Sequence, residues 1–247
     1  MPSVPSAERT LNLFETFEAS GRPLALSELA QRMNVPVSSC HGLVQTLVAR
    51  GYLYAVSRRK DFYPTRRLLD LAQAIVHNDP FLERIGSELQ ALRDETRETV
   101  ILGKRQGDAV LYLDVVEGTH TVRYTARPGE YKPLHSSSIG KVMLGALHDD
   151  VLAEWLLSHP LPAVTGRTLS DGKRLRRDLD ESRRRGWFMT RGENVEDVTA
   201  LAVGLSIRDE IFGLAVAGPS HRMEKRIDDL AARLVAARRR IEEVFHQ

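Results

Sequence analysis

Cysteine is almost absent from this chain of 247 residues. Cys40 stands alone, so no disulfide can form within the chain, and we expect a protein of the reducing cytoplasm. No apolar run approaches the roughly 18 residues that a membrane-spanning helix requires. The opening MPSVPSAERT lacks the basic and apolar regions of a signal peptide. We therefore expect neither secretion nor a membrane partner.

A strong charge of either sign is also missing. The formal net charge is +2, which by itself is a weak argument for a nucleic-acid partner. The charge is unevenly distributed, however, because residues 1–78 contain nine basic and six acidic residues. Four of these bases fall within residues 58–66, in sequence typical of a loop. This local excess is suggestive of a polyanionic partner.

Motifs for catalysis and metal binding are lacking as well. The histidines are scattered without the spacing of metal ligands, so we expect no metal site and no cofactor. The stretch SIGK at 138–141 resembles the end of a phosphate-binding loop, but His135 replaces the required leading glycine, and Val142 follows the lysine. His135 lies beside three serines without the glycine-flanked serine elbow of a hydrolase. We predict a protein without catalytic activity.

The first 65 residues predict three helices and a hairpin. Apolar spacing and turn residues place the helices and then two short strands at about 7–19, 26–33, 36–50, 52–56 and 61–64. A tight corner at Asn34-Val35-Pro36 joins the last two helices, and the basic stretch SRRKD forms the tip of the hairpin. This order indicates a winged helix-turn-helix domain over residues 1–65.

The third helix, within SSCHGLVQTLVARGYL, has an unusual exposed face. Opposite its apolar side it carries only short, uncharged groups, namely Ser38, Ser39, His41, Gly42 and Gln45. A helix that reads base edges in the major groove needs such groups and close access, so we predict that these residues contact DNA. Gly42 costs about 1 kcal/mol relative to alanine inside a helix, and close approach of the backbone to DNA would explain it. The alternative is that Gly42 merely admits a neighbouring helix.

The predicted wing carries a basic tip. Arg58, Arg59 and Lys60 are expected to contact phosphates or a minor groove. The alternative for these three residues is an ordinary solvated hairpin tip.

A linker helix follows over residues 66–79. Its apolar surface is too wide for an isolated helix, and it comprises Leu68, Leu69, Leu71, Ala72, Ala74, Ile75 and Val76. The most economical cover is the same helix of a second subunit, so we predict a homodimer. Asn78-Asp79-Pro80 marks the boundary to a second domain over residues 80–247.

The second domain alternates helices and short strands. The pattern places strands at about 100–105, 109–116, 121–126, 187–190, 199–208 and 211–217, the last two joined by a turn at Asp209-Glu210. Helices are expected at about 81–95, 138–147, 150–159, 171–185 and 223–245. Hairpin-linked strands flanked by helices indicate an α+β fold on a mainly antiparallel sheet.

One segment of this domain suits an anion. PLHSSSIGKVMLGAL places small residues and free backbone N–H groups at the start of a helix. The helix dipole and these unpaired donors favour a carboxylate or another anion there. The alternative is an ordinary serine-capped helix.

Four segments stand out along the chain: SAERTLNLFETF, LALSELAQRMNVPVSSCHGLVQTLVARGYL, PLHSSSIGKVMLGAL and GWFMTRGENVEDVTALAVGLSIRDEIFGLAVAGPS. In order and spacing, over nearly the full length, they resemble the IclR family of bacterial transcriptional regulators. The resemblance implies a winged helix-turn-helix, a linker helix and an effector domain with a GAF-like or profilin-like sheet. It also implies dimers that commonly pair into tetramers, and control, usually repression, of catabolic operons in response to small organic acids or aromatic metabolites.

The resemblance also implies a set of effector contacts. The ligand carboxylate would meet the backbone N–H groups of Ser138 and Ile139, and further contacts would come from the strand positions Thr190, Ala200, Ala215 and Ala217. The family often has an acidic residue, a cysteine and two serines at these four strand positions. The family also often has a larger or basic residue where Gly42 stands.

These departures bear on the ligand. Methyl groups replace polar side chains, so a tiny polar keto acid would find few hydrogen-bonding partners. We therefore predict an acid with a larger apolar body, for example an aromatic one. Arg123, Arg127 and Arg191 are each candidates to pair with the acid.

Two other functions are compatible with parts of the sequence. An enzyme acting on a small acid would need a nucleophile, a base and an orienting group, and no such set is found. An architectural DNA-binding protein without an effector would not need a large second domain with small residues at the expected contact positions.

Overall fold

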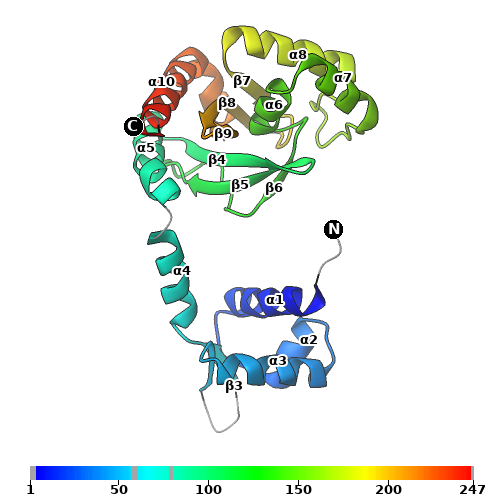
Figure 1. Cartoon of the computed structure of the whole chain (residues 1–247), viewed down its shortest axis with the longest axis vertical. Helices are drawn as coiled ribbons and strands as arrows, with labels where there is room; N and C mark the ends of the chain where they lie inside the picture. The colour runs from blue at the N-terminus through cyan, green and yellow to red at the C-terminus, as the bar shows by residue number, and fades with distance from the viewer. Residues whose placement is uncertain (1–3, 57–60, 78–79, 246–247) are drawn as a thin grey trace. The chain divides into compact units, whose positions relative to one another are not determined.

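The computed structural model describes residues 4–56, 61–77 and 80–245. The chain divides into two compact units, Met1–Pro80 and Phe81–Gln247, each with its own hydrophobic core (Figure 1). In the part of the chain that is described, no helix combines the length and the apolar character needed to cross a lipid bilayer.

The first unit has the predicted helix-turn-helix arrangement with a small antiparallel sheet. Its helices are α1 (Pro5–Ser20), α2 (Leu26–Arg32), α3 (Val37–Ala49) and α4 (Arg67–His77). The strands β1 (Leu24–Ala25), β3 (Asp61–Pro64) and β2 (Leu53–Ala55) pair in that order, and β1 was not expected from the sequence. Asn34 makes the corner between α2 and α3 with a φ of 52°, in the left-handed region that asparagine tolerates.

A single apolar cluster holds these elements together. Leu13 and Phe17 of α1 meet Leu29 of α2 and Val44 of α3, all of them buried. Cys40 belongs to the same cluster at 1% exposure, and burial raises the pKa of its thiol. The cysteine is therefore a packing residue, held as the neutral thiol.

The second unit is built on a six-stranded antiparallel sheet of order β6-β5-β4-β9-β8-β7. The strands are β4 (Thr99–Gln106), β5 (Ala109–Val116), β6 (Tyr131–Pro133), β7 (Phe188–Arg191), β8 (Val198–Ile207) and β9 (Glu210–Pro219). Its helices are α5 (Pro80–Thr96), α6 (Ser138–Gly145), α7 (Asp149–Ser158), α8 (Gly172–Arg185), α9 (Ser220–Met223), the 3-10 turn η1 (Glu224–Arg226) and α10 (Ile227–Phe245). The α+β class and the antiparallel sheet are as predicted.

The two faces of this sheet bury different residues. Large residues such as Leu201, Val203 and Leu214 pack against α5 and α10 on one face. The alternate positions on the other face carry small residues, Ala200, Ala202, Ala215 and Ala217, beneath α6 and its neighbours. Figure 1 shows α6, α7 and α8 on one side of the sheet and α5 with α10 on the other. Because side chains alternate between the two faces of a strand, large side chains fill the face under α5 and α10, and small side chains let α6 lie close to the other face.

Two details differ from the sequence prediction. Residues 121–126 are not a strand, because the place beside β5 is taken by β6, where Leu111 pairs with Tyr131. The hairpin between β8 and β9 turns at Arg208 and Asp209, both at positive φ, rather than at Asp209-Glu210. Positive φ at both central residues matches the right-handed twist of the flanking strands, and Glu210 instead pairs with Ile207.

Candidate functional site

The outer face of α3 is open to solvent. Ser38, Ser39, His41, Gly42 and Gln45 are all exposed, whereas Cys40, Val44 and Leu47 on the opposite face are buried. A Cβ atom added at Gly42 would meet nothing within 4 Å among the residues that the structure describes. Among the described residues of this chain, Gly42 therefore makes no room for a neighbouring helix. The predicted wing residues Arg58, Arg59 and Lys60 lie outside the described residues.

In the second unit, α6 lies unusually close to the sheet. Gly103 of β4 pairs with Gly213 of β9, which pairs with Gly204 of β8, so three glycines form a row across the strands. A Cβ atom on Gly213 would stand 2.4 Å from Cγ2 of Ile139, and one on Gly204 would stand 3.3 Å from a methyl carbon of the next α6 turn. The glycine row is a groove that accepts the side chains of α6.

The start of α6 is a capped helix terminus. The Ser137 hydroxyl accepts a hydrogen bond from the Gly140 N–H at 3.1 Å and donates to the Pro133 carbonyl at 2.7 Å. Gly140 has no room for a side chain unless its surroundings move, because an added Cβ would stand 2.2 Å from the Leu134 carbonyl oxygen. The serine cap that the sequence left as an alternative is present, and it satisfies one of the first backbone donors of the helix.

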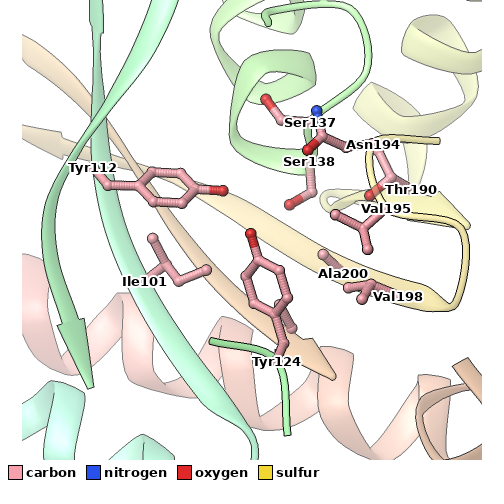
Figure 2. A pocket seen from close by; sticks show the side chains of 11 residues that line it. Ile101, Tyr112, Tyr124, Ser137, Ser138, Thr190, Asn194, Val195, Val198 and Ala200 are labelled. Carbon is pink, nitrogen blue, oxygen red and sulfur yellow. The ribbon is translucent and has the colours of Figure 1, made fainter. Parts of the chain in front are cut away.

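A small cavity adjoins this terminus. Its volume is about 30 Å³, which is room for roughly one water molecule. It is lined by Ile101, Tyr112, Tyr124, Ser137, Ser138, Thr190, Asn194, Val195, Val198, Ala200 and Ala217. Figure 2 shows the hydroxyl groups of Tyr112, Tyr124 and Ser138 directed into the same space. Since the lining comes from five strands, the start of α6 and two loops, residues distant in the sequence converge here.

The residues expected to contact an effector divide into two groups. Ser138, Thr190, Ala200 and Ala217 line the cavity. Ile139 and Ala215 do not line it: the Ile139 side chain fills the groove over Gly213, and Ala215 is 1% exposed within the core of the same face.

The three candidate arginines lie elsewhere. None of Arg123, Arg127 and Arg191 is among the described residues that line the cavity. The Arg123 guanidinium is 2.6 Å from the Glu117 carboxylate, and Arg191 is exposed. In the structure as it stands, no arginine reaches the cavity from these positions.

Three polar lining residues were not found from the sequence. Tyr112 could have been, because it alternates with Val110 on the inner face of β5. Tyr124 was missed because residues 121–126 were wrongly predicted to form a strand. Asn194 lies in the loop after β7. Their presence corrects the expectation, drawn from the alanines, of a cavity with few hydrogen-bonding groups.

A buried lysine braces this site. Lys141 of α6 is fully buried, and its ammonium lies 2.8 Å from Glu193 and 2.9 Å from Asp178 of α8. It also donates to the Met189 carbonyl at 3.2 Å. Burial raises the pKa of the Glu193 carboxyl even though Lys141 opposes this effect. The lysine thus ties α6 to α8 and to the β7–β8 loop that carries Asn194, rather than to a phosphate.

The remaining chemistry does not indicate catalysis. His135 is buried with Nε2 2.9 Å from the Pro162 carbonyl oxygen, and burial lowers its pKa. No group of three or more potential metal ligands is present among the described residues. Within the described ranges of the chain, the residues that line the cavity include no histidine or carboxylate beside its hydroxyl groups, as a hydrolase would have.

Comparisons with known proteins match both units. Residues 6–57 match the IclR helix-turn-helix domain, and residues 73–243 match the C-terminal domain of the bacterial transcriptional regulator IclR. The regulator BhcR of Paracoccus denitrificans is 29% identical over 237 residues, which cover 95% of this chain and 85% of that one. The transcriptional repressor IclR of Escherichia coli is 27% identical over 244 residues, which cover 96% and 89%.

A solved structure has the same fold. An IclR homologue from Microbacterium hydrocarbonoxydans, crystallised with 4-hydroxybenzoate, superposes with a TM-score of 0.78 at 24% identity and covers 98% of this chain and 99% of that one. Both halves of the molecule are thus accounted for by one group of regulators, rather than by an enzyme family. The chain belongs to the IclR family of bacterial transcriptional regulators.

Proposed function

We propose that this regulator binds double-stranded operator DNA through its first unit and a small organic acid through its second, and that it represses a catabolic operon in the cytoplasm. The observation that carries the proposal is the polar cavity beside the start of α6, in a unit separate from the one with the exposed α3 face. No cofactor takes part. The acid alone changes the DNA affinity.

The base contacts are proposed for the exposed, uncharged face of α3. Ser38, Ser39, His41 and Gln45 present donors and acceptors there, and Gln45 has the amide geometry that pairs with adenine. Gly42 keeps the backbone free to approach the groove. The wing residues Arg58, Arg59 and Lys60 supply phosphate contacts that do not depend on base sequence.

Dimerisation is proposed through α4. Its apolar residues are exposed in the single chain, with Ile75 at 63%, Val76 at 57% and Leu69 at 47%. A second copy of the helix would remove this surface from water and would set two α3 helices on a pseudo-palindromic operator. Half-sites are then expected about one helical turn apart or a multiple of it. Pairing of two dimers through the second unit follows from the family resemblance.

The effector is proposed to enter the cavity with its carboxylate toward Ser138 and the start of α6. The backbone donors and the helix dipole favour a negative charge there. The Ala200 and Ala217 methyl groups then contact its apolar body. An aromatic acid suits this arrangement, and a regulator of the same fold was crystallised with 4-hydroxybenzoate. Since the cavity is smaller than such a ligand, its walls must move apart on binding.

The regulatory step is a shift between two arrangements of the DNA-binding units across the dimer. The effector can move this equilibrium only by as much as its affinity differs between the two arrangements. An effector that binds both equally well would leave the DNA affinity unchanged. We propose that the loops around the cavity, which move apart on binding, are the elements that differ between the two states.

A band-shift on DNA upstream of the protein's own gene tests the proposal. We expect a retarded band that one acid from an aromatic and aliphatic panel releases or tightens. Ala200→Leu should fill the cavity and remove the response while the band remains. Ala163→Leu is the matched control, because Ala163 is exposed and outside the cavity. A band that no acid alters would instead support an architectural DNA-binding protein, and no band at low salt would refute DNA binding.

A further inference from the structure

The wall of the cavity that faces α6 is made by two tyrosines. Tyr112 comes from β5 and Tyr124 from the irregular segment 119–126. In Figure 2 the Tyr112 ring enters from the left and the Tyr124 ring from below, while Ser138 lies to the upper right. The two phenol groups therefore face the start of α6 across the space where the effector is proposed to bind.

We propose that Tyr112 and Tyr124 bind a second oxygen atom of the effector, at the end remote from its carboxylate, and so select oxygenated acids over plain ones. The inference rests on the proposed effector site and deepens it by naming the ligand class. The ligand is an organic acid whose far end carries a hydroxyl, carbonyl or carboxylate oxygen that accepts a hydrogen bond.

The first argument is that Tyr112 is an O–H donor held in a desolvated place. Its side chain belongs to the buried core at 6% exposure, yet its hydroxyl reaches the cavity. Burial, together with the adjacent Tyr124 phenol, raises the pKa of Tyr112, so the group stays neutral at physiological pH. A neutral phenol keeps its hydrogen and can donate it to a ligand oxygen.

The second argument is the cation behind the pair. Lys132 and Tyr124 lie side by side, and the Lys132 ammonium interacts with the Tyr124 phenol. An ammonium can only donate, so it faces the Tyr124 oxygen and not the Tyr124 hydrogen. The Tyr124 hydrogen therefore points away from the cation, on the side of the cavity that Tyr124 shares with Tyr112. Two phenol hydrogens beside a cation are met most favourably by an acceptor atom.

Lys132 is itself fixed in place for this role. Its ammonium lies 2.7 Å from the Glu130 carboxylate and 5.7 Å from the centre of the Tyr112 ring. The residue belongs to β6, which pairs with β5 so that Lys132 stands beside Val110. The sheet register therefore positions the cation behind both phenols.

The third argument is that Tyr124 can give the ligand room. Residues 119–126 have no strand pairing, and side-chain bonds hold their backbone: Thr99 Oγ1 donates to the Tyr124 carbonyl, and Arg222 donates to the Val122 carbonyl at 3.1 Å. Beyond Tyr124 lies an outer groove of about 640 Å³, which shares Tyr124, Val195 and Val198 with the cavity. An outward movement of Tyr124 joins the two spaces, whereas Tyr112 stays fixed on β5.

The alternative is that the two hydroxyls merely satisfy each other inside the core. The two cases differ in what happens with a pair of acids that differ by one distal oxygen. An acid without that oxygen would leave the Tyr112 donor buried and unpaired, which is penalised only if the hydroxyl faces the ligand. The comparison within each pair therefore isolates the phenol from every other contact.

The experiment is calorimetric titration of the full-length protein with two such pairs, benzoate with 4-hydroxybenzoate and pentanoate with 5-hydroxypentanoate. In at least one pair we expect the oxygenated acid to bind about tenfold more tightly. Tyr112→Phe should abolish this ratio by weakening the oxygenated acid alone, and Lys132→Met should reduce it. Tyr131→Phe, at an exposed tyrosine one residue before Lys132, should leave the ratio unchanged.

Each other outcome is decisive. If Tyr112→Phe weakens both members of a pair equally, or if the unaltered protein does not distinguish them, the selectivity inference is overturned and the small-acid site stands. If the unaltered protein binds none of the four acids, the proposed effector site fails and the inference fails with it. Thermal unfolding of each variant, at an unchanged midpoint, confirms that the comparison is made on folded protein.

Discussion

Helices α3 and α6 carry nearly the same residue types in opposite surroundings. A run of serines followed by a glycine stands at the start of each, at 38–42 within α3 and at 136–140 across the N-cap of α6, and neither helix has an acidic residue in its first turn. On α3 the serines and Gly42 are exposed, whereas in α6 every residue from Ser138 to Leu144 is buried. Small residues thus leave room for an outside partner in one helix and for the protein's own sheet in the other.

The two glycines show this contrast most directly. A Cβ added at Gly42 meets nothing within 4 Å, but one added at Gly140 meets the Leu134 backbone at 2.2 Å. A helix face made of small residues therefore indicates that something packs closely against it, but the sequence does not say whether this is an outside partner or another part of the protein. The charges differ in the same way, since α6 buries Lys141 between two carboxylates and the exposed face of α3 carries no formal charge.

The largest expected effect is at the buried charge of α6. Lys141→Met keeps the length of the side chain but leaves Asp178 and Glu193 without their cation, so we expect a loss of about 3–5 kcal/mol in the free energy of unfolding. Chemical denaturation of the second unit measures it. Lys173→Met at an exposed position of α8 is the matched control and should change stability little. An equal, small change in both variants would show that α6 does not depend on its lysine.

The next effect tests the glycine of α6. Gly140→Ala forces the Leu134 backbone or the helix to move, and we expect a destabilisation of about 1–3 kcal/mol. Melting curves of the purified variant would show it as a lowered midpoint. Unchanged stability would mean that α6 can shift away from Leu134, and the contrast with α3 would then disappear.

The matched substitution in α3 should have the opposite sign. Gly42→Ala meets no neighbour and gains helix propensity, so we expect up to about 1 kcal/mol of added stability. If the backbone there approaches DNA, the same variant should bind operator DNA more weakly at constant salt, which a fluorescence anisotropy titration measures. A more stable protein with unchanged operator affinity would remove Gly42 from the DNA contact.

The smallest effect is a pH dependence at Glu193. Burial raises the pKa of this carboxyl in the folded protein, and its Oε2 atom is buried without a hydrogen-bond partner among the described residues. The folded state therefore binds the proton more tightly than the unfolded chain. This contribution to stability is present at acid pH and is lost as the pH rises from the ordinary glutamate value through the raised one. Glu193→Gln should flatten the unfolding profile in that window, and an unchanged profile would contradict the assignment.

The fold was largely predictable because its signals are local. Apolar spacing, the corner at Asn34 and the glycine that ends α1 define the helix-turn-helix within a short stretch of chain. Alternation along β8 and β9 likewise identified the longest hairpin. The strand predicted at 121–126 was wrong. An alternating pattern indicates only that a segment can join a sheet, and in the fold residues 131–133 take the place beside β5.

The candidate site was predictable only in part, for a related reason. Ser138, Thr190, Ala200 and Ala217 came from the family resemblance, and all four line the cavity. The Ile139 side chain fills the groove over Gly213, while the expected contact of its backbone N–H group stays a prediction, and Tyr124 enters from a segment outside the sheet. Which side chain faces the cavity and which faces the sheet depends on the depth at which α6 docks.

The sequence by itself determined the family, the order of the helices and the alternation that separates the two faces of the sheet. These follow from short-range rules of periodicity, turn geometry and local composition. The tertiary structure alone decided that the serine-rich face of α3 is exposed and that of α6 is buried, and that two tyrosines line the cavity with a lysine behind them. The reason is that Tyr112, Tyr124 and Ser138 are brought together by strand register and close packing, which connect residues far apart in the chain.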